Sequence, residues 1–94
     1  MNAFTAQMSV ARGRWRLYVA LLGTTEAWPE CSFGRAVPIP TPVERVQALS
    51  RLGFEPLPDA EWEWSEYSQD PEDLASPVGL IATLRVRSRA EERP

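Results

Sequence analysis

The chain has 94 residues, of which 13 are acidic and 10 basic, so its formal net charge is −3. It contains no histidine and one cysteine, and every basic residue is an arginine. These absences remove the usual general base, the commonest metal ligand and the lysine amine from its chemistry. The composition therefore favours a single small domain that is not an enzyme and that holds neither a metal ion nor a cofactor.

The chain also lacks the signals of a membrane or secreted protein. Its longest apolar run, Leu17–Leu22, is far shorter than the about 20 residues that span a bilayer. The N-terminus has no basic segment followed by a long apolar stretch, and one cysteine cannot form an internal disulfide. We therefore expect a cytoplasmic protein without membrane contact, ordered over about residues 4–89, with a frayed tail at 90–94.

The first predicted element is a β-hairpin. Apolar side chains alternate along Phe4–Ala11 and along Arg14–Leu22, which is the period of half-buried strands. Between them lies Arg12-Gly13, and glycine accepts the positive φ that a two-residue turn needs. This turn makes one face of the hairpin apolar. The opposed pairs are Val10 with Trp15, Met8 with Leu17, Ala6 with Val19, and Phe4 with Leu21.

Residues 24–40 are expected to form an irregular loop, because they contain three prolines and no periodic apolar pattern. Long loops of this kind are uncommon in compact domains and are often functional. Aromatic and arginine side chains are the usual anchors of protein interfaces. Trp28, Phe33 and Arg35 are therefore a first candidate surface for a partner, and anchoring of the loop on the protein's own core is the alternative.

A helix is predicted directly after this loop. Thr41 suits the N-cap, Pro42 suits the first turn, and Glu44 completes a capping box. Gly53 suits the C-terminal end of the helix. Apolar side chains at three-residue spacing are expected to face the core. These side chains are Val43, Val46, Leu49 and Leu52.

Two further strands are predicted at Ala60–Tyr67 and Val78–Arg89, with the polar loop 69–77 between them. Trp62 and Trp64 share one face of the first strand and are expected to point inward. We expect each tryptophan to lie opposite an apolar residue of the second strand. In that register the carboxylates of the first strand lie opposite arginines of the second, which supports the pairing. The opposed pairs are Trp64 with Leu84, Trp62 with Val86, Glu63 with Arg85, and Glu61 with Arg87.

The predicted fold class is α+β with the element order ββαββ. A four-stranded, mainly antiparallel sheet with the helix packed on one face is the simplest architecture for this order, and the strand order stays open.

Charge is segregated along the chain. Residues 55–73 contain eight acidic and no basic side chains, whereas residues 1–25 and 78–89 contain three arginines each and no acid. Mutual neutralisation on the solvent face of the sheet is the favoured reading, and a partner surface is the alternative. The residues of this second candidate surface are Arg14, Arg16, Tyr18, Arg85 and Arg87.

Candidate catalytic chemistry is weak. Glu61 and Glu63 share a strand face, but such spacing alone is common, and Cys31 has no neighbouring base to stabilise a thiolate. We predict a non-enzymatic protein-interaction module, an accessory or regulatory partner of another protein, and self-association as a homodimer is a further possibility. The alternative is a nucleic-acid-associated accessory protein that uses the arginine face, and the acidic total weighs against it.

Several segments also carry a resemblance to other proteins. They are Arg14–Leu21, Trp28-Pro29-Glu30, Phe33-Gly34-Arg35, Ala60-Glu61-Trp62-Glu63-Trp64 and Ser76-Pro77-Val78. Together they resemble a family of short, uncharacterised actinobacterial proteins of Streptomyces type, over nearly the whole chain. The resemblance implies a small, stand-alone cytoplasmic protein, and it implies no activity and no catalytic residue.

Overall fold

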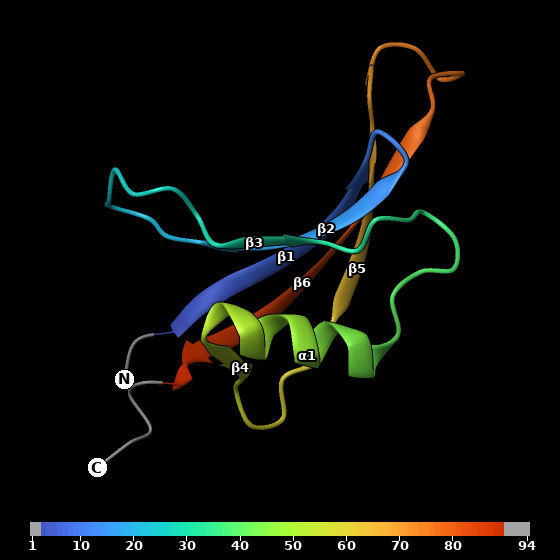
Figure 1. The fold of residues 1–94 in the computed structure, drawn as a ribbon. Coiled ribbons are helices and arrows are strands. Elements are labelled where there is room, and N and C mark those ends of the chain that lie inside the picture. The colour runs from blue at the N-terminus through green and yellow to red at the C-terminus, as the bar shows by residue number, and fades with distance from the viewer. Residues whose placement is uncertain (1–2, 90–94) are drawn as a thin grey trace.

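The computed structural model describes residues 3–89, in which one curled antiparallel sheet packs against a single helix (Figure 1). The expected α+β class is confirmed, but the sheet has six strands in place of four, and the order is not ββαββ. The strands are β1 (Ala3–Ala11), β2 (Arg14–Ala20), β3 (Glu30–Ser32), β4 (Phe54–Pro56), β5 (Glu63–Ser68) and β6 (Val78–Ser88), and the helix is α1 (Pro42–Leu52).

The strands follow the order β3-β2-β1-β6-β4 across the sheet, and β5 also pairs with β6. β4 and β5 therefore lie along the same edge of the long strand β6. The molecule measures 53 × 29 × 26 Å, and the loop before β3 and the β5–β6 turn project from it (Figure 1). No helix in the described part of the chain is long and apolar enough to cross a membrane. The expected frayed tail, 90–94, lies outside the described residues.

The β1–β2 hairpin confirms the predicted turn. Arg12 and Gly13 have φ of 54° and 74°, and two successive positive φ values characterise the type I′ turn that suits a twisted hairpin. Three of the predicted pairs are present, namely Val10 with Trp15, Met8 with Leu17, and Ala6 with Val19. The fourth pair, Phe4 with Leu21, is not part of the ladder, because β2 ends at Ala20.

The expected irregular loop contains the short strand β3, which pairs with β2. The prediction missed it because three residues between prolines carry no periodic pattern. Backbone hydrogen bonds extend the pairing beyond β3, from Val19 N to Pro29 O at 3.0 Å and from Phe33 N to Trp15 O at 2.9 Å. These bonds satisfy backbone groups of β2 that would otherwise form an open sheet edge.

The helix caps follow the prediction. Thr41 Oγ1 accepts a hydrogen bond from Glu44 N at 3.2 Å, and Glu44 Oε1 accepts one from Thr41 N at 3.0 Å. Gly53 ends the helix with φ 93°. The predicted apolar stripe is confirmed for Leu49 and Leu52 and is wrong for Val43 and Val46. A step of three residues turns about 60° around an α-helix, so four such positions span about half its circumference. Val43 and Val46 are accordingly exposed.

The buried face of α1 instead follows the spacing i, i+3, i+4, i+7. Arg45, Ala48 and Leu49 are buried on it, and Leu52 is partly buried against the core. Because the first of these four positions is an arginine, the pattern of apolar residues does not reveal this face.

The predicted register between the last two strands is also wrong. Trp64 lies opposite Ala82, and Glu63 lies opposite Thr83, so the pairing is shifted by two residues. β4 occupies the part of the β6 edge that the prediction assigned to Glu61 and Trp62. Since β4 follows the helix directly, it pairs with the end of β6 nearest to α1, and β5 is displaced along the strand.

The core lies between the inner face of the sheet and α1. Its buried apolar members are Ala6, Met8, Trp15, Leu17, Val19, Ala48, Leu49, Phe54, Ala82, Leu84 and Val86. Trp62 is partly buried against this cluster, as expected. Trp64 lies on the inner face, as expected, but it is 42% exposed, so the prediction that it belongs to the buried core is wrong.

Arg45 explains the position of the two tryptophans. It is only 8% exposed, and its Cζ lies 5.4 Å from the ring centroid of Trp62 and 5.5 Å from that of Trp64. Its Nε donates a hydrogen bond to Pro40 O at 2.8 Å. Burial lowers the pKa of the guanidinium. Because a cation is attracted to the face of an indole ring, Arg45 covers rings that would otherwise need apolar partners.

Candidate interaction surface

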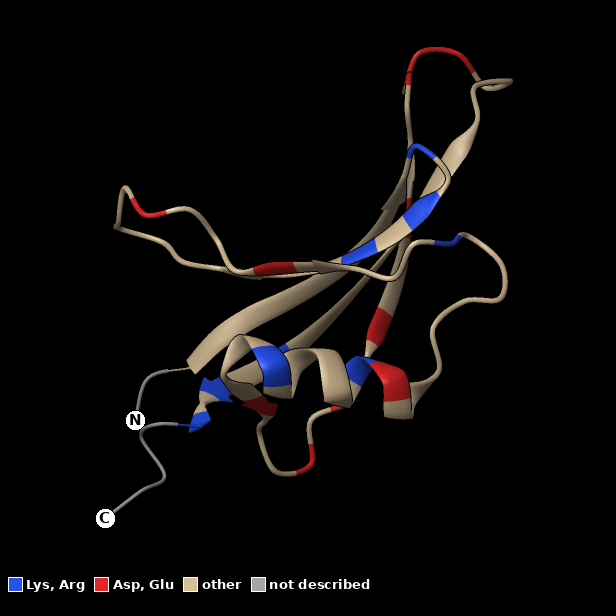
Figure 2. Cartoon of the chain, viewed as in Figure 1, with Lys and Arg blue, Asp and Glu red and all other residues tan. Residues whose placement is uncertain are grey.

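The outer face of the sheet is the side away from α1, and strand β2 supplies its most distinctive side chains. The burial of β2 alternates residue by residue, with Trp15, Leu17 and Val19 buried on the inner face. The intervening residues, Arg14, Arg16 and Tyr18, therefore lie on the outer face. Figure 2 shows two of the basic positions as neighbouring blue segments of this strand.

Trp28 joins this face although it comes from the loop before β3. Its ring stacks on that of Tyr18, with 6.2 Å between centroids and 19° between planes. Its Nε1 donates a hydrogen bond to Leu21 O at 3.0 Å, which fixes the orientation of the indole. Together with Ala27 and Glu30, the two rings line a hollow of about 590 Å³.

Three arginines line a second hollow beside the aromatic pair. It has a volume of about 550 Å³ and is lined by Ala11, Arg12, Arg14, Arg16, Glu30 and Ser32. The residues opposite the arginines in the ladder are small, since Ala11 faces Arg14 and Ser32 faces Arg16. The long side chains therefore line an open groove without neighbours that fill it.

The charge of this groove is only partly compensated. Glu30 Oε2 lies 3.5 Å from Arg16 Nη1, in an exposed ion pair. Within residues 3–89, Arg12 and Arg14 form no ion pair, although the chain has more acidic than basic side chains. Glu30 lines both hollows, so the two are neighbours on the surface. We call Arg12, Arg14, Arg16, Tyr18, Trp28 and Glu30 the β2 surface.

Arg85 and Arg87 lie on the same face but on the far strand β6, across β1. Arg87 forms an ion pair with Glu55, with 2.8 Å between Nη2 and Oε2. The expected partner Glu61 is wrong, because β4 brings Glu55 opposite Arg87. Arg85 is exposed and lies opposite Thr5. The five residues of the predicted sheet surface are therefore divided between two places.

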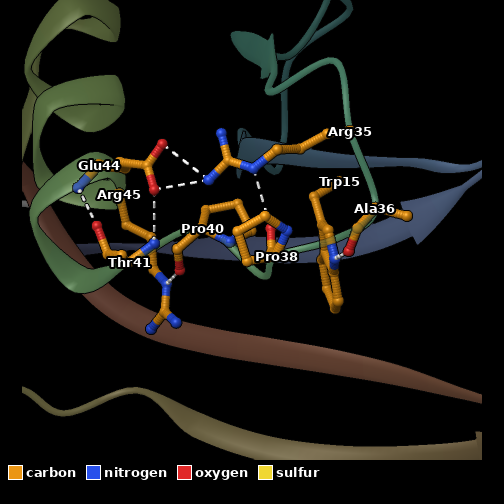
Figure 3. A network of polar contacts seen from close by, with 8 residues as sticks. All are labelled: Trp15, Arg35, Ala36, Pro38, Pro40, Thr41, Glu44 and Arg45. Atoms are coloured by element: carbon orange, nitrogen blue, oxygen red, sulfur yellow. Dashed lines mark hydrogen bonds and ion pairs between the residues drawn. The ribbon is translucent and has the colours of Figure 1, made fainter.

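The loop residues are divided as well. Phe33 is partly buried against the core. Arg35 holds the loop to the start of α1, where its Nη2 lies 2.7 Å and 2.9 Å from the two carboxylate oxygens of Glu44 (Figure 3). Its Nε also donates to Pro38 O at 3.0 Å. Of the three loop residues, Trp28 alone reaches the β2 surface.

The ion pair between Arg35 and Glu44 shifts the pKa of both side chains. The hydrogen bond from Arg35, followed by the backbone hydrogen bond from Thr41, lowers the pKa of Glu44 to about 2. The same pair raises the pKa of Arg35. Arg35 and Glu44 thus satisfy each other, in contrast to the arginines of the groove.

A third hollow, of about 550 Å³, lies where β4 and β5 leave the edge of β6 between them. Asp59, Glu61 and Glu63 line it together with Trp62 and Arg85. Within residues 3–89, no group of carboxylate and thiol side chains is arranged to hold a metal ion. Cys31 lies opposite Leu17, on the inner face of β3.

Residues 2–93 match a family of unknown function, DUF6303. The chain belongs to this family. The expected membership in a family of uncharacterised proteins is confirmed. No curated protein and no solved structure matches this DUF6303 protein.

Two residues of the β2 surface in this DUF6303 chain are not among the candidate residues that the sequence predicts. From the sequence, Arg12 belongs to the turn and Glu30 to the loop. Strand alternation does not assign a face to Arg12, because this residue lies in the two-residue turn between the strands. The place of Glu30 depends on the pairing of β3 with β2, which no sequence pattern indicates.

Proposed function

We propose that this DUF6303 protein is a non-enzymatic interaction module, an accessory or regulatory partner that docks another protein on its β2 surface. The observation that carries the proposal is the stacked pair of Tyr18 and Trp28 on the outer face. Trp28 stays 44% exposed there and does not enter the core.

Physical chemistry supports an interface at this place. Aromatic and arginine side chains supply most of the binding energy of protein interfaces, and the β2 surface combines both. The stack and the Nε1 hydrogen bond already hold Trp28 in one orientation. A partner would therefore pay little side-chain entropy when it covers the indole.

A single-stranded nucleic acid is the second candidate ligand. Stacked aromatic rings beside arginines are also the elements on which such strands bind. The carboxylate of Glu30 lies between the rings and the arginines, and the net charge is −3, and both features oppose a phosphate backbone. We therefore rank a protein partner above it.

The cellular setting is part of the proposal. The use of arginine at all ten basic positions fits a GC-rich actinobacterial genome. The single cysteine fits the reducing cytoplasm, where disulfides are rare.

Affinity capture from an extract of the native host tests the docking surface. The wild-type chain is compared with Trp28→Ala and with Val46→Ala, a control on the exposed side of α1 whose exposure of 45% matches the 44% of Trp28. We expect one protein to be retained in stoichiometric amount by wild type and by Val46→Ala, and to be lost with Trp28→Ala. The partner is then purified and titrated directly against the three chains.

Two results would contradict the proposal. Equal retention by Trp28→Ala would exclude the aromatic pair as the anchor. Retention of nucleic acid that falls steeply with added salt would instead support the second candidate, because phosphate contacts release counterions.

A further inference from the structure

The turn between β5 and β6 presents an unusual combination of side chains. Residues 69–77 project from one end of the molecule, and their acidic positions form the red segment in Figure 2. Asp70, Glu72 and Asp73 are followed directly by Leu74, which is fully exposed. Because the side chain of Leu74 is in full contact with water, a partner that covers it would gain free energy from the burial of its apolar surface.

Hydrogen bonds hold this turn in a defined shape. Asp70 Oδ1 accepts from Glu72 N at 3.1 Å, and Asp73 Oδ1 accepts from Ala75 N at 2.9 Å. Asp70 N donates in turn to Ser76 Oγ at 3.0 Å. The turn therefore presents Leu74 and Glu72 from a preformed backbone, which lowers the ordering cost of docking.

The β2 surface has the complementary chemistry. Its groove has two arginines without an ion pair among residues 3–89, and the exposed aromatic pair adjoins it. Along β2, Arg16 and Arg14 lie two and four residues from Tyr18, which is about 7 and 13 Å at the rise of a strand. With Leu74 on the aromatic pair, the carboxylates just before it come within reach of these guanidinium groups.

The turn does not satisfy this groove within its own chain, since no ion pair among residues 3–89 joins the two. Both nevertheless lie at the same end of the sheet, because Ser9 pairs with Ile81 next to the two turns. A two-fold axis near this end would let each copy insert its turn into the surface of the other. Such a contact is closed and self-complementary.

We propose that the occupant of the β2 surface is the β5–β6 turn of a second copy, so that the protein forms a reciprocal dimer. The inference rests on the proposed function, because it names what binds to that same surface. Leu74 covers the Tyr18–Trp28 pair, and Glu72 and Asp73 face the arginine groove. The dimer contact competes with any other protein that docks there, so self-association limits access to the surface.

Sedimentation equilibrium of the purified full chain, from micromolar to millimolar concentration, tests the dimer. Leu74→Asp is expected to weaken the association about tenfold or more, because it removes the apolar contact and places a carboxylate on aromatic rings. Val43→Asp is the matched control. Val43 is also exposed, and the first turn of a helix tolerates an acidic side chain.

A charge exchange tests the ionic half of the contact. Arg14→Glu and Glu72→Arg are each expected to weaken the dimer, and the chain that carries both changes is expected to recover much of the affinity. Recovery requires that the two positions face each other across the contact, and a failure of the double variant to recover would overturn the assigned geometry.

The outcomes separate this inference from the proposed function. A chain that stays monomeric, yet loses another protein on Trp28→Ala, overturns the dimer and leaves the docking surface in place. A dimer that Leu74→Asp does not weaken also overturns the inference. A dimer broken by Leu74→Asp but unchanged by Trp28→Ala overturns the β2 surface itself as the place where the turn binds.

Discussion

Two regions of this molecule differ in whether their arginine side chains have partners within the chain. At the start of α1, Arg35 and Arg45 are engaged by their own chain, the first by Glu44 and the second by Pro40 O and two tryptophan rings. At the β1–β2 hairpin end, Arg12 of the turn and Arg14 of β2 line an open groove without an ion pair among residues 3–89. The comparison teaches that the role of an arginine depends on whether the fold supplies its partners.

The difference arises from the neighbours that each region provides. The helix start gathers the carbonyl oxygens of a proline-rich loop and a capping glutamate around the guanidinium groups. The hairpin end offers small side chains, such as Ala11 and Ser32, and a carboxylate, Glu30, that pairs with Arg16. The first region thus stabilises the fold, and the second is available for binding.

The largest expected effect is on the buried arginine. Arg45→Ala removes the contacts with Trp62 and Trp64 and the hydrogen bond to Pro40, and it leaves a cavity beneath the rings. We expect the free energy of unfolding in urea to fall by about 2–3 kcal/mol. A variant as stable as wild type would show that the guanidinium does not hold the helix to β5, and the contrast between the two regions would break down.

The next effect is on acid stability. Because the folded pKa of Glu44 is lowered to about 2, the unfolded chain binds more protons than the folded chain between that value and the ordinary pKa of about 4.5. The stability from the Arg35–Glu44 pair is thus fully present above the pKa that Glu44 has in the unfolded chain. It is lost as the pH falls through the pKa that Glu44 has in the folded chain. Urea unfolding of wild type and Glu44→Gln at pH 7, 4 and 2.5 measures this.

We expect Glu44→Gln to be less stable than wild type at pH 7, and the gap between the two to close toward pH 2.5. A gap that stays constant with pH would mean that the charge of Glu44 contributes nothing to the fold.

The smallest expected effect on stability is that of Arg14→Ala, and it is compared with that of Arg35→Ala. Arg14→Ala is expected to leave the urea midpoint unchanged within error, since Arg14 is exposed and forms no ion pair with the described residues. Arg35→Ala is expected to lower the midpoint, because it releases the loop from Glu44. A lowered midpoint for Arg14→Ala would place the β2 arginines among the residues that stabilise the fold.

Local features were predictable where neighbours in sequence decide them. The turn at Arg12-Gly13 and the strand alternation beside it specify the β1–β2 register, and the ladder confirms it. The capping residues Thr41 and Glu44 interact over three positions of one turn, so the start of α1 was predictable too.

The rest of the fold depended on competition between distant segments. β4 pairs with the part of β6 that was expected to pair with the residues around Trp62, so β5 pairs farther along β6. No property of the residues around Trp62 predicts this. The buried face of α1 was hidden because Arg45 occupies a position that a hydrophobic pattern assigns to an apolar side chain. The two indole rings and the carbonyl oxygen of Pro40 make that position acceptable.

The candidate site was also predictable only in part from the sequence. The sequence named Arg14, Arg16 and Tyr18 as one outward-facing row, since alternate residues of a strand share a face. It could not place Trp28 on Tyr18, because the two residues meet only after the loop turns back along β2 to form β3.

By itself the sequence determined the β1–β2 hairpin, the caps of the helix and the α+β class, since backbone conformation and side-chain period act between residues close in the chain. Only the tertiary structure decided which strand pairs with which part of β6, how Arg45 is buried and which arginines remain open. These outcomes depend on distant segments that compete for the same hydrogen bonds, carboxylates and rings.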